Sequence, residues 1–160
     1  MALQRVILRL PLAYRAFFLF IEPVSALAGA YYCHFRQDQY LELLLHGAST
    51  SSTSSPVPTT VSVALSQLAN MYFFFALIES LVLRCTWDLR VWRTVLLVLL
   101  IADFGHLYSL LELGSAVYYD GAGWNVSLFF NIPWVYAGAT MRMCFLAGVG
   151  LQHSKRQKQQ

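Results

Sequence analysis

Charged side chains are scarce in this 160-residue chain: only 12% of the residues are Asp, Glu, Lys or Arg, whereas 58% are hydrophobic. A soluble globular domain carries about 25% charged residues, so water would leave much of this apolar surface uncovered. The composition therefore excludes an ordinary soluble domain and indicates that the lipid bilayer is a partner of the chain. The net charge of +3 comes from basic residues at the ends of apolar segments, which gives no sign of a nucleic-acid partner.

Several sequence motifs of known chemistry are also missing. The three cysteines, Cys33, Cys85 and Cys144, are far apart, and no Cys-x-x-Cys or Cys/His metal-ligand spacing occurs. The chain has no GxSxG, P-loop, GxGxxG or HExxH motif. A paired DxxD motif is absent as well, which disfavours chemistry on a magnesium–diphosphate complex. The sequence thus predicts no metal site and indicates no cofactor.

Four hydrophobic segments are long enough to cross a bilayer, which takes about 20 helical residues. They cover residues 13–33, 66–86, 91–113 and 126–148. They predict a single all-α domain over residues 1–160, built as a four-helix transmembrane bundle. The first two segments are separated by a Ser/Thr/Pro-rich run at 49–60, which we expect to be a flexible loop.

Basic residues predict how the bundle is oriented. They precede the first segment, surround the connection between the second and third, and follow the fourth: Arg5, Arg9, Arg15, Arg84, Arg90, Arg93, Lys155, Arg156 and Lys158. The positive-inside rule then places both termini in the cytosol. The basic tail resembles a dilysine-type retrieval signal and equally a plain cytosolic anchor, and either suits an endoplasmic-reticulum membrane protein. Asn125-Val126-Ser127 is a weak glycosylation candidate, because it adjoins the membrane on the lumenal side.

Five ionisable residues interrupt these apolar segments: Glu22, Glu79, Asp103, His106 and Arg142. At 1.5 Å of rise per residue they fall within roughly 10–12 Å of membrane depth. An ionisable side chain at the centre of a transmembrane helix costs a few kcal/mol and usually faces a cavity or a partner. We therefore expect a polar site inside the bundle, with Glu79, Asp103, Glu22 and His106 as the catalytic candidates.

Other side chains are candidates for binding a substrate: Arg142, Asn131, Trp134, Tyr72 and Tyr108. Arg142 is always protonated and is suited to orienting a carboxylate. Asn131 precedes it by eleven residues, which returns to nearly the same helical angle. Gly138 lies between them and leaves room for a ligand or a neighbouring helix. The alternative is that the polar groups are interhelical hydrogen-bond clamps and the aromatic residues are packing.

These residue types indicate acid–base chemistry. A carboxyl group kept away from water can hold its proton and act as an acid, while a second carboxylate paired with Arg142 or His106 stays ionised and acts as a base. The surrounding segments are rich in aromatic rings, whose faces can stabilise a developing cation. Such a site suits protonation of an olefin or an epoxide in a lipophilic substrate.

The arrangement resembles the sterol-isomerase and sigma-2-receptor superfamily. The shared features are four spans with cytosolic ends, an acid on each of the second and third spans, and the Asn131-Ile-Pro-Trp134 motif on the fourth. This resemblance implies that Glu79 and Asp103 protonate a double bond and remove a proton elsewhere, beside the Asn131–Trp134 pair. The superfamily has a histidine one turn before the glutamate, where this chain has Phe75.

Residues 11–32 (PLAYRAFFLFIEPVSALAGAYY) look like a family of small fungal four-span proteins, some encoded among natural-product genes beside membrane terpene cyclases and epoxide-opening enzymes. The resemblance implies a membrane enzyme of fungal secondary metabolism that opens an epoxide in a lipophilic polyketide or terpenoid, by hydrolysis or cyclisation. The alternatives are a sterol or lipid isomerase, a non-catalytic sterol- or lipid-binding protein, and a structural or assembly subunit. A homodimer or an association with other pathway enzymes stays open.

Overall fold

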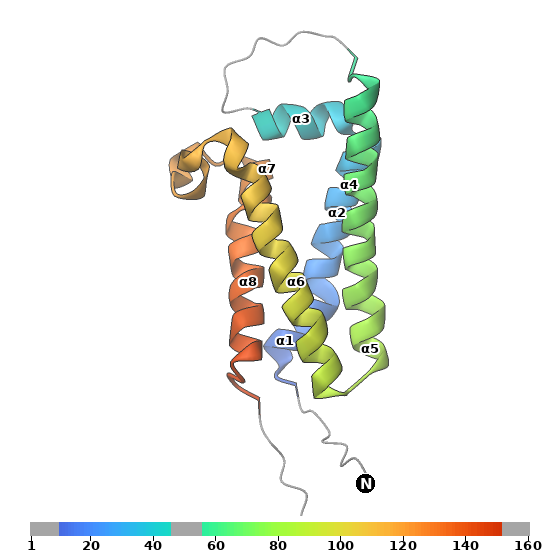
Figure 1. The fold of residues 1–160 in the computed structure, drawn as a ribbon, viewed down its shortest axis with the longest axis vertical. Helices are drawn as coiled ribbons and strands as arrows, with labels where there is room; N and C mark the ends of the chain where they lie inside the picture. Colours follow the sequence, from blue (N-terminus) through green and yellow to red (C-terminus); the bar gives the residue numbers. More distant parts are fainter. Residues whose placement is uncertain (1–9, 46–55, 152–160) are drawn as a thin grey trace, which may run out of the picture.

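The structure, a computed structural model, describes residues 10–45 and 56–151, and all regular secondary structure in these ranges is helical. The helices run side by side as an elongated bundle, with the first and last described residues at the same end (Figure 1). The expectation of an all-α bundle is therefore confirmed for the described chain.

Three continuous helices are long and apolar enough to cross a membrane: Leu12–Phe35, Thr59–Cys85 and Leu89–Leu113, of 24, 27 and 25 residues. The first comprises α1 (Leu12–Ala16), the π-helical turn η1 (Phe17–Ile21) and α2 (Glu22–Phe35). The second comprises α4 (Thr59–Leu77), the π-helical turn η2 (Ile78–Val82) and α5 (Leu83–Cys85). The third is α6 (Leu89–Ser109), which tightens into the 3-10 turn η3 (Leu110–Leu113). These are the helices of an integral membrane protein.

The second long helix begins earlier than the sequence predicts. It starts at Thr59 rather than at residue 66, so Thr59 and Thr60 belong to the helix and not to the Ser/Thr loop. Pro58 precedes it with φ −55° and ψ 140°, the extended backbone that commonly stands before a helix. A hydrophobicity pattern misses these first turns because they are polar. Positions 49–55 of the expected loop lie outside the described residues.

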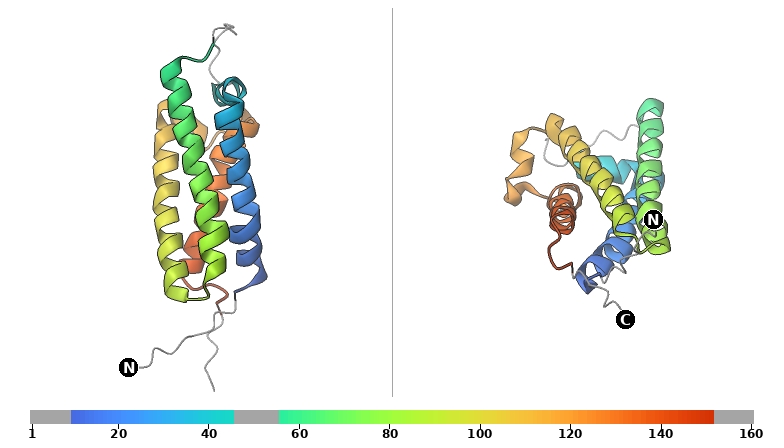
Figure 2. Two further views of the ribbon diagram at one scale, coloured as in Figure 1. Left: turned by 90° about the vertical axis from the view of Figure 1, so that its right-hand side faces the viewer. Right: turned by 60° about the horizontal axis from the view of Figure 1, so that its bottom comes forward.

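The segment expected as one helix over 126–148 is broken. It forms α7 (Val126–Asn131) and α8 (Pro133–Leu146), which meet at Ile132 with φ −123° and ψ −72°. Pro133 explains the break, since proline supplies no backbone N–H and its ring crowds the preceding turn. α8 packs along α6 (Figures 1 and 2).

A short helix, α3 (Gln37–Leu45), lies across one end of the bundle (Figure 1). Two side chains attach it to its neighbours. Gln37 Nε2 donates to the Ser62 carbonyl at 3.3 Å, and Asn125 Nδ2 donates to the Leu43 carbonyl. The nearby connection between α6 and α7 contains two short 3-10 turns, η4 (Ser115–Tyr118) and η5 (Gly121–Gly123). We call this the α3 end.

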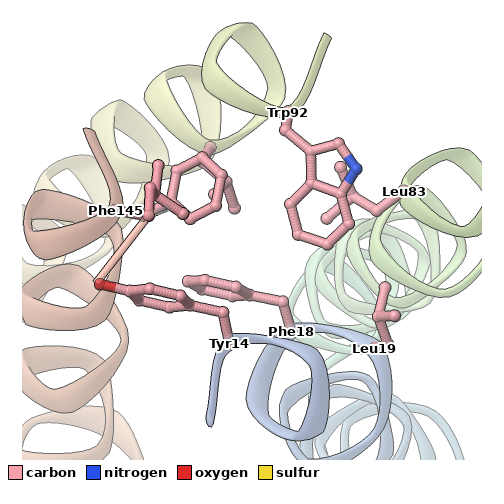
Figure 3. Packing of buried hydrophobic residues seen from close by; sticks show 8 residues of the cluster. Tyr14, Phe18, Leu19, Leu83, Trp92 and Phe145 are labelled. Carbon is pink, nitrogen blue, oxygen red and sulfur yellow. The ribbon is translucent and has the colours of Figure 1, made fainter. Parts of the chain in front are cut away.

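The opposite end is filled by apolar side chains, which we call the apolar plug (Figure 3). Its members come from every long helical segment and are Tyr14, Phe18, Leu19, Leu83, Trp92, Leu96, Phe145 and Leu151. All eight are buried. Two hydrogen bonds satisfy the polar atoms of the large rings: the Tyr14 hydroxyl donates to the Val149 carbonyl at 2.9 Å, and Trp92 Nε1 donates to the Thr86 carbonyl at 3.0 Å. A smaller cluster of Leu110, Leu128 and Ile132 packs α6 against α7 near the α3 end.

Candidate functional site

Four charged side chains meet in the interior of the bundle. The guanidinium of Arg142 on α8 is fully buried, and its Nη1 donates to Asp103 Oδ2 on α6 at 2.9 Å. Its Nη2 donates to Glu79 Oε1 in η2 at 3.0 Å and lies 2.9 Å from Glu22 Oε2 at the start of α2. We call these four residues the acid cluster. The expectation that they face one another across the bundle is correct.

Two π-helical turns set the positions of the glutamates. Each inserts one extra residue into a helical turn, a distortion that occurs frequently at functional sites. Glu22 directly follows η1 and Glu79 lies within η2, and the two turns pack against each other. The sequence predicts regular α-helices over both segments and therefore reveals neither π-helical turn.

Pro23 contributes to the distortion of the first helix. It has no N–H for the Leu19 carbonyl, its partner in a regular α-helix. Arg84, from the second long helix, donates to that carbonyl instead, with Nη2 at 2.5 Å, and its guanidinium lies 4.4 Å from the centre of the Phe20 ring. Arg84 is one of the basic residues that predict the orientation of the bundle, and in the structure it also links two helices.

Gly138 on α8 makes the close approach possible. A Cβ at this position would lie 2.8 Å from Arg142 Nη1 and 2.8 Å from Glu22 Oε1, which is too close for either atom. The sequence predicts that Gly138 leaves room for a ligand or a helix. The room is taken by two side chains of the acid cluster itself.

Two phenylalanines flank the buried cation. The Arg142 guanidinium lies 5.6 Å from the centre of the Phe18 ring and 5.4 Å from that of Phe75, which is cation–π range. Phe18 precedes Glu22 by four residues, and Phe75 precedes Glu79 by four. Residues four apart share a helical face, so this spacing was the signal that could have identified both rings.

The acid cluster contains more acids than bases. Three carboxyl groups face one guanidinium, and each has an oxygen within 3.0 Å of a guanidinium nitrogen. The Glu22–Arg142 contact is an ion pair without hydrogen-bond geometry. The buried atoms Glu22 Oε2, Glu79 Oε2 and Arg142 Nε accordingly lack a hydrogen-bond partner.

His106 does not join the acid cluster, although the sequence places it at the same level. It lies one turn beyond Asp103 on α6, where its imidazole is next to Asn131, and its ring centre is 6.4 Å from that of Tyr72. Asn131 in turn donates from Nδ2 to the Ser127 carbonyl at 2.8 Å. The prediction that Asn131 and Arg142 share a helical face requires one continuous helix. The break at Ile132 interrupts the helix between them, so this prediction is wrong.

The remaining candidates are scattered. Trp134 Nε1 donates to Ser25 Oγ at 3.0 Å, and that hydroxyl donates to the Glu22 carbonyl at 2.7 Å, so Trp134 is linked to the backbone of Glu22. Tyr108 is 76% exposed on the outside of α6 and does not contribute to an interior site. Asn125 caps α7 by accepting from the Leu128 N–H at 2.9 Å, and it also bonds to Leu43. A glycan on Asn125 would break the bond to Leu43.

Within residues 10–45 and 56–151, no group of three or more His, Cys, Asp or Glu side chains is arranged to hold a metal ion. The physical reason at the acid cluster is that the position between the carboxyl groups is occupied by the Arg142 guanidinium.

The fold and the acid cluster together define a helical integral membrane protein with a charged centre. The chain belongs to the family described as a domain of unknown function, DUF7704, whose model matches residues 7–152. No curated protein and no solved structure matches the chain.

Proposed function

We propose that this protein is a membrane-embedded acid–base enzyme that opens an epoxide in a lipophilic polyketide or terpenoid substrate at the acid cluster. The observation that carries the proposal is the surplus of carboxyl groups over cations in a site screened from water. The proposal includes a fourth span formed by α7 and α8, cytosolic termini, and residence in the endoplasmic reticulum of a fungus.

The surplus of acids supplies a proton donor and a base in one place. If all four groups were ionised, the cluster would hold three negative charges against one positive charge. Like charges this close in a low-dielectric interior do not all ionise. Charge neutrality is reached when one carboxylate pairs with Arg142 and the other two carboxyls keep their protons. This is the division of roles that acid–base catalysis requires.

The residues then take complementary roles. Glu79 or Asp103 donates its proton to the epoxide oxygen, the carbon–oxygen bond breaks, and positive charge develops on the carbon. The faces of Phe18 and Phe75, which already flank a cation, stabilise that charge. The other acid or Glu22 takes a proton from the attacking water or internal hydroxyl, so the reaction neither gains nor loses protons.

The test is an assay in microsomes from an expression host. Wild type, Glu79→Gln and Asp103→Asn are incubated with polyene and terpenoid epoxides, and the products are identified by mass spectrometry. General acid–base groups contribute about 10²- to 10⁴-fold to rate, so we expect each variant to lose at least about 100-fold. Glu112→Gln, an exposed acid in η3, is the matched control and keeps full activity. Turnover by both variants at the wild-type rate would overturn the proposal.

A structural role for the acid cluster is the second candidate, because Arg142 is fully buried and its contacts reach three other helical segments. In a clamp, the charges serve to fix how the helices pack. This reading predicts that Glu79→Gln and Asp103→Asn lower the yield of folded protein, with no substrate turned over by any variant. A catalytic acid often behaves in the opposite way, since relieving a buried charge can stabilise the fold.

A sterol- or lipid-binding protein, or a lipid isomerase, is a further alternative with an observation of its own. An open groove of about 380 Å³ lies between α2 and α4, lined by aromatic residues such as Tyr31, Phe35 and Phe73 and by the polar His34 and Asn70. Because none of the residues lining this groove belongs to the acid cluster, ligand binding there would survive both acid-to-amide changes. Loss of sterol binding in Asn70→Leu, with epoxide turnover absent, would favour this alternative.

A further inference from the structure

The acid cluster is sealed on the side of the apolar plug. On three helices a plug residue stands one helical turn from a cluster residue: Phe18 four before Glu22, Leu83 four after Glu79, and Phe145 three after Arg142. All three side chains are at most 1% exposed. The described plug offers no chain of polar side chains that could carry a proton to the cluster from this end.

The other side of the acid cluster is polar. The side chains of Tyr40 on α3, Tyr72 on α4 and Cys33 on α2 lie next to one another. The ring of Tyr72 lies beside the imidazole of His106 on α6. From His106, one turn of α6, or about 4.5 Å of rise, leads to Asp103 in the acid cluster.

His106 is placed to pass a proton. Its Nε2 is buried and has no hydrogen-bond partner, so Nδ1 is the ring nitrogen available to donate to the neighbouring Asn131. A neutral imidazole whose Nδ1 donates carries its lone pair on Nε2. That nitrogen can take up a proton and release the same proton toward Asp103, with one water molecule bridging the turn between them.

We infer that the acid cluster exchanges protons with the compartment at the α3 end, through Tyr72 and His106, while the apolar plug closes the opposite end. The inference rests on the proposed function in one respect, namely that the cluster holds a proton to exchange. Tyr72 and His106 are relay residues, and neither needs to touch the substrate.

The experiment measures hydrogen–deuterium exchange of the protonated carboxyl groups without any substrate. Purified full-length protein in lipid nanodiscs is moved into D₂O, and infrared spectroscopy follows the shift of the protonated carboxyl band. In His106→Phe and Tyr72→Phe we expect exchange to slow by about tenfold, because each change removes one group that can pass a proton. The matched controls are His34→Phe and Tyr108→Phe, which change exposed side chains of the same types.

A further variant separates the relay from the fold. His106→Gln keeps a side-chain donor for Asn131 but cannot take up a proton, so it should fold normally and exchange as slowly as His106→Phe. Wild-type exchange rates in His106→Gln and Tyr72→Phe would overturn the relay and leave the protonated cluster standing. A wild-type spectrum with no deuterium-sensitive carboxyl band would overturn both the relay and the proposed function. If the wild type shows the carboxyl band but turns over no epoxide in the microsome assay, that result would count only against the proposed function.

Discussion

Arg142 is the single cation in contact with three buried carboxyl groups of the described chain, so removing it differs from removing one acid. Arg142→Leu leaves these acids uncompensated, and breaking a buried pair in this way costs about 3–5 kcal/mol. Glu79→Gln keeps an oxygen for Arg142 and removes one surplus acid, so we expect about 1 kcal/mol or less. Denaturant titration of the purified protein measures both, with the exposed Arg93→Leu as control. Equal losses at the two positions would contradict the charge argument.

Gly138 offers a test of close packing at the same site. Gly138→Ala places a methyl group 2.8 Å from both Arg142 and Glu22, whose ends are held by their ion pair, and overpacking of this kind costs about 1–3 kcal/mol. Gly105→Ala is the matched control. Its Cβ would meet nothing within 4 Å, so the change should stabilise α6 by about 0.5–1 kcal/mol through helix propensity alone. Thermal unfolding should therefore shift in opposite directions for the two variants, and a shift of the same sign would refute this account of Gly138.

At the scale of the element, the link between Pro23 and Arg84 predicts a coupling between two helices. Pro23→Ala restores the N–H that the Leu19 carbonyl lacks, so Arg84 loses its role as the substitute donor. In wild type, Arg84→Leu leaves that carbonyl unsatisfied and costs about 1–3 kcal/mol. In the Pro23→Ala background the same change should cost roughly 1 kcal/mol less. A double-mutant cycle measures this difference, and strictly additive effects would show that the two residues are independent.

The helices and the depth of the charged residues could be predicted from the sequence, whereas their exact geometry could not. Apolar runs locate the helices because a helix needs about 20 apolar residues to cross the hydrocarbon core of a bilayer. Depth follows from the constant rise per residue, which is why Glu22, Glu79, Asp103 and Arg142 were expected at one level. The direction in which a side chain points around its helix is harder to predict. Each π-helical turn, and the break at Ile132, rotates the residues that follow it.

Two particular residues show the limit. The depth of His106 groups it with the acids, but its imidazole lies next to Asn131 instead, because α7 ends beside it. Tyr108 was grouped with them as one of many aromatic residues, and it faces outward. Which side of a helix faces the interior depends on its neighbours, and in an apolar helix the sequence carries little signal of that choice.

On the scale of the whole molecule, the exposed charges of the described residues are divided between the two ends. Within residues 10–45 and 56–151, the end with the apolar plug carries four exposed arginines and one aspartate: Arg15, Arg84, Arg90, Arg93 and Asp88. The α3 end carries four exposed acids and one arginine: Asp38, Glu42, Glu112, Asp120 and Arg36. Because cytosolic connections are enriched in Lys and Arg, this asymmetry predicts a cytosolic plug and a lumenal α3 end. Under that orientation the relay through His106 would draw protons from the lumen.

The orientation and the number of spans can be tested together by labelling with a membrane-impermeant maleimide in intact microsomes. Cys85 is exposed at the plug end and should label directly, whereas a Ser115→Cys variant at the α3 end should label only after the membrane is permeabilised. Cys85→Ala and Cys144→Ala, combined with the buried Cys33, provide the background for Ser115→Cys. Epitope tags at the two termini complete the test. They lie on one side if α7 and α8 cross as a fourth span, and on opposite sides if only the three continuous helices cross. Labelling of Ser115→Cys in intact vesicles would reverse the orientation, and tags on opposite sides would refute the fourth span.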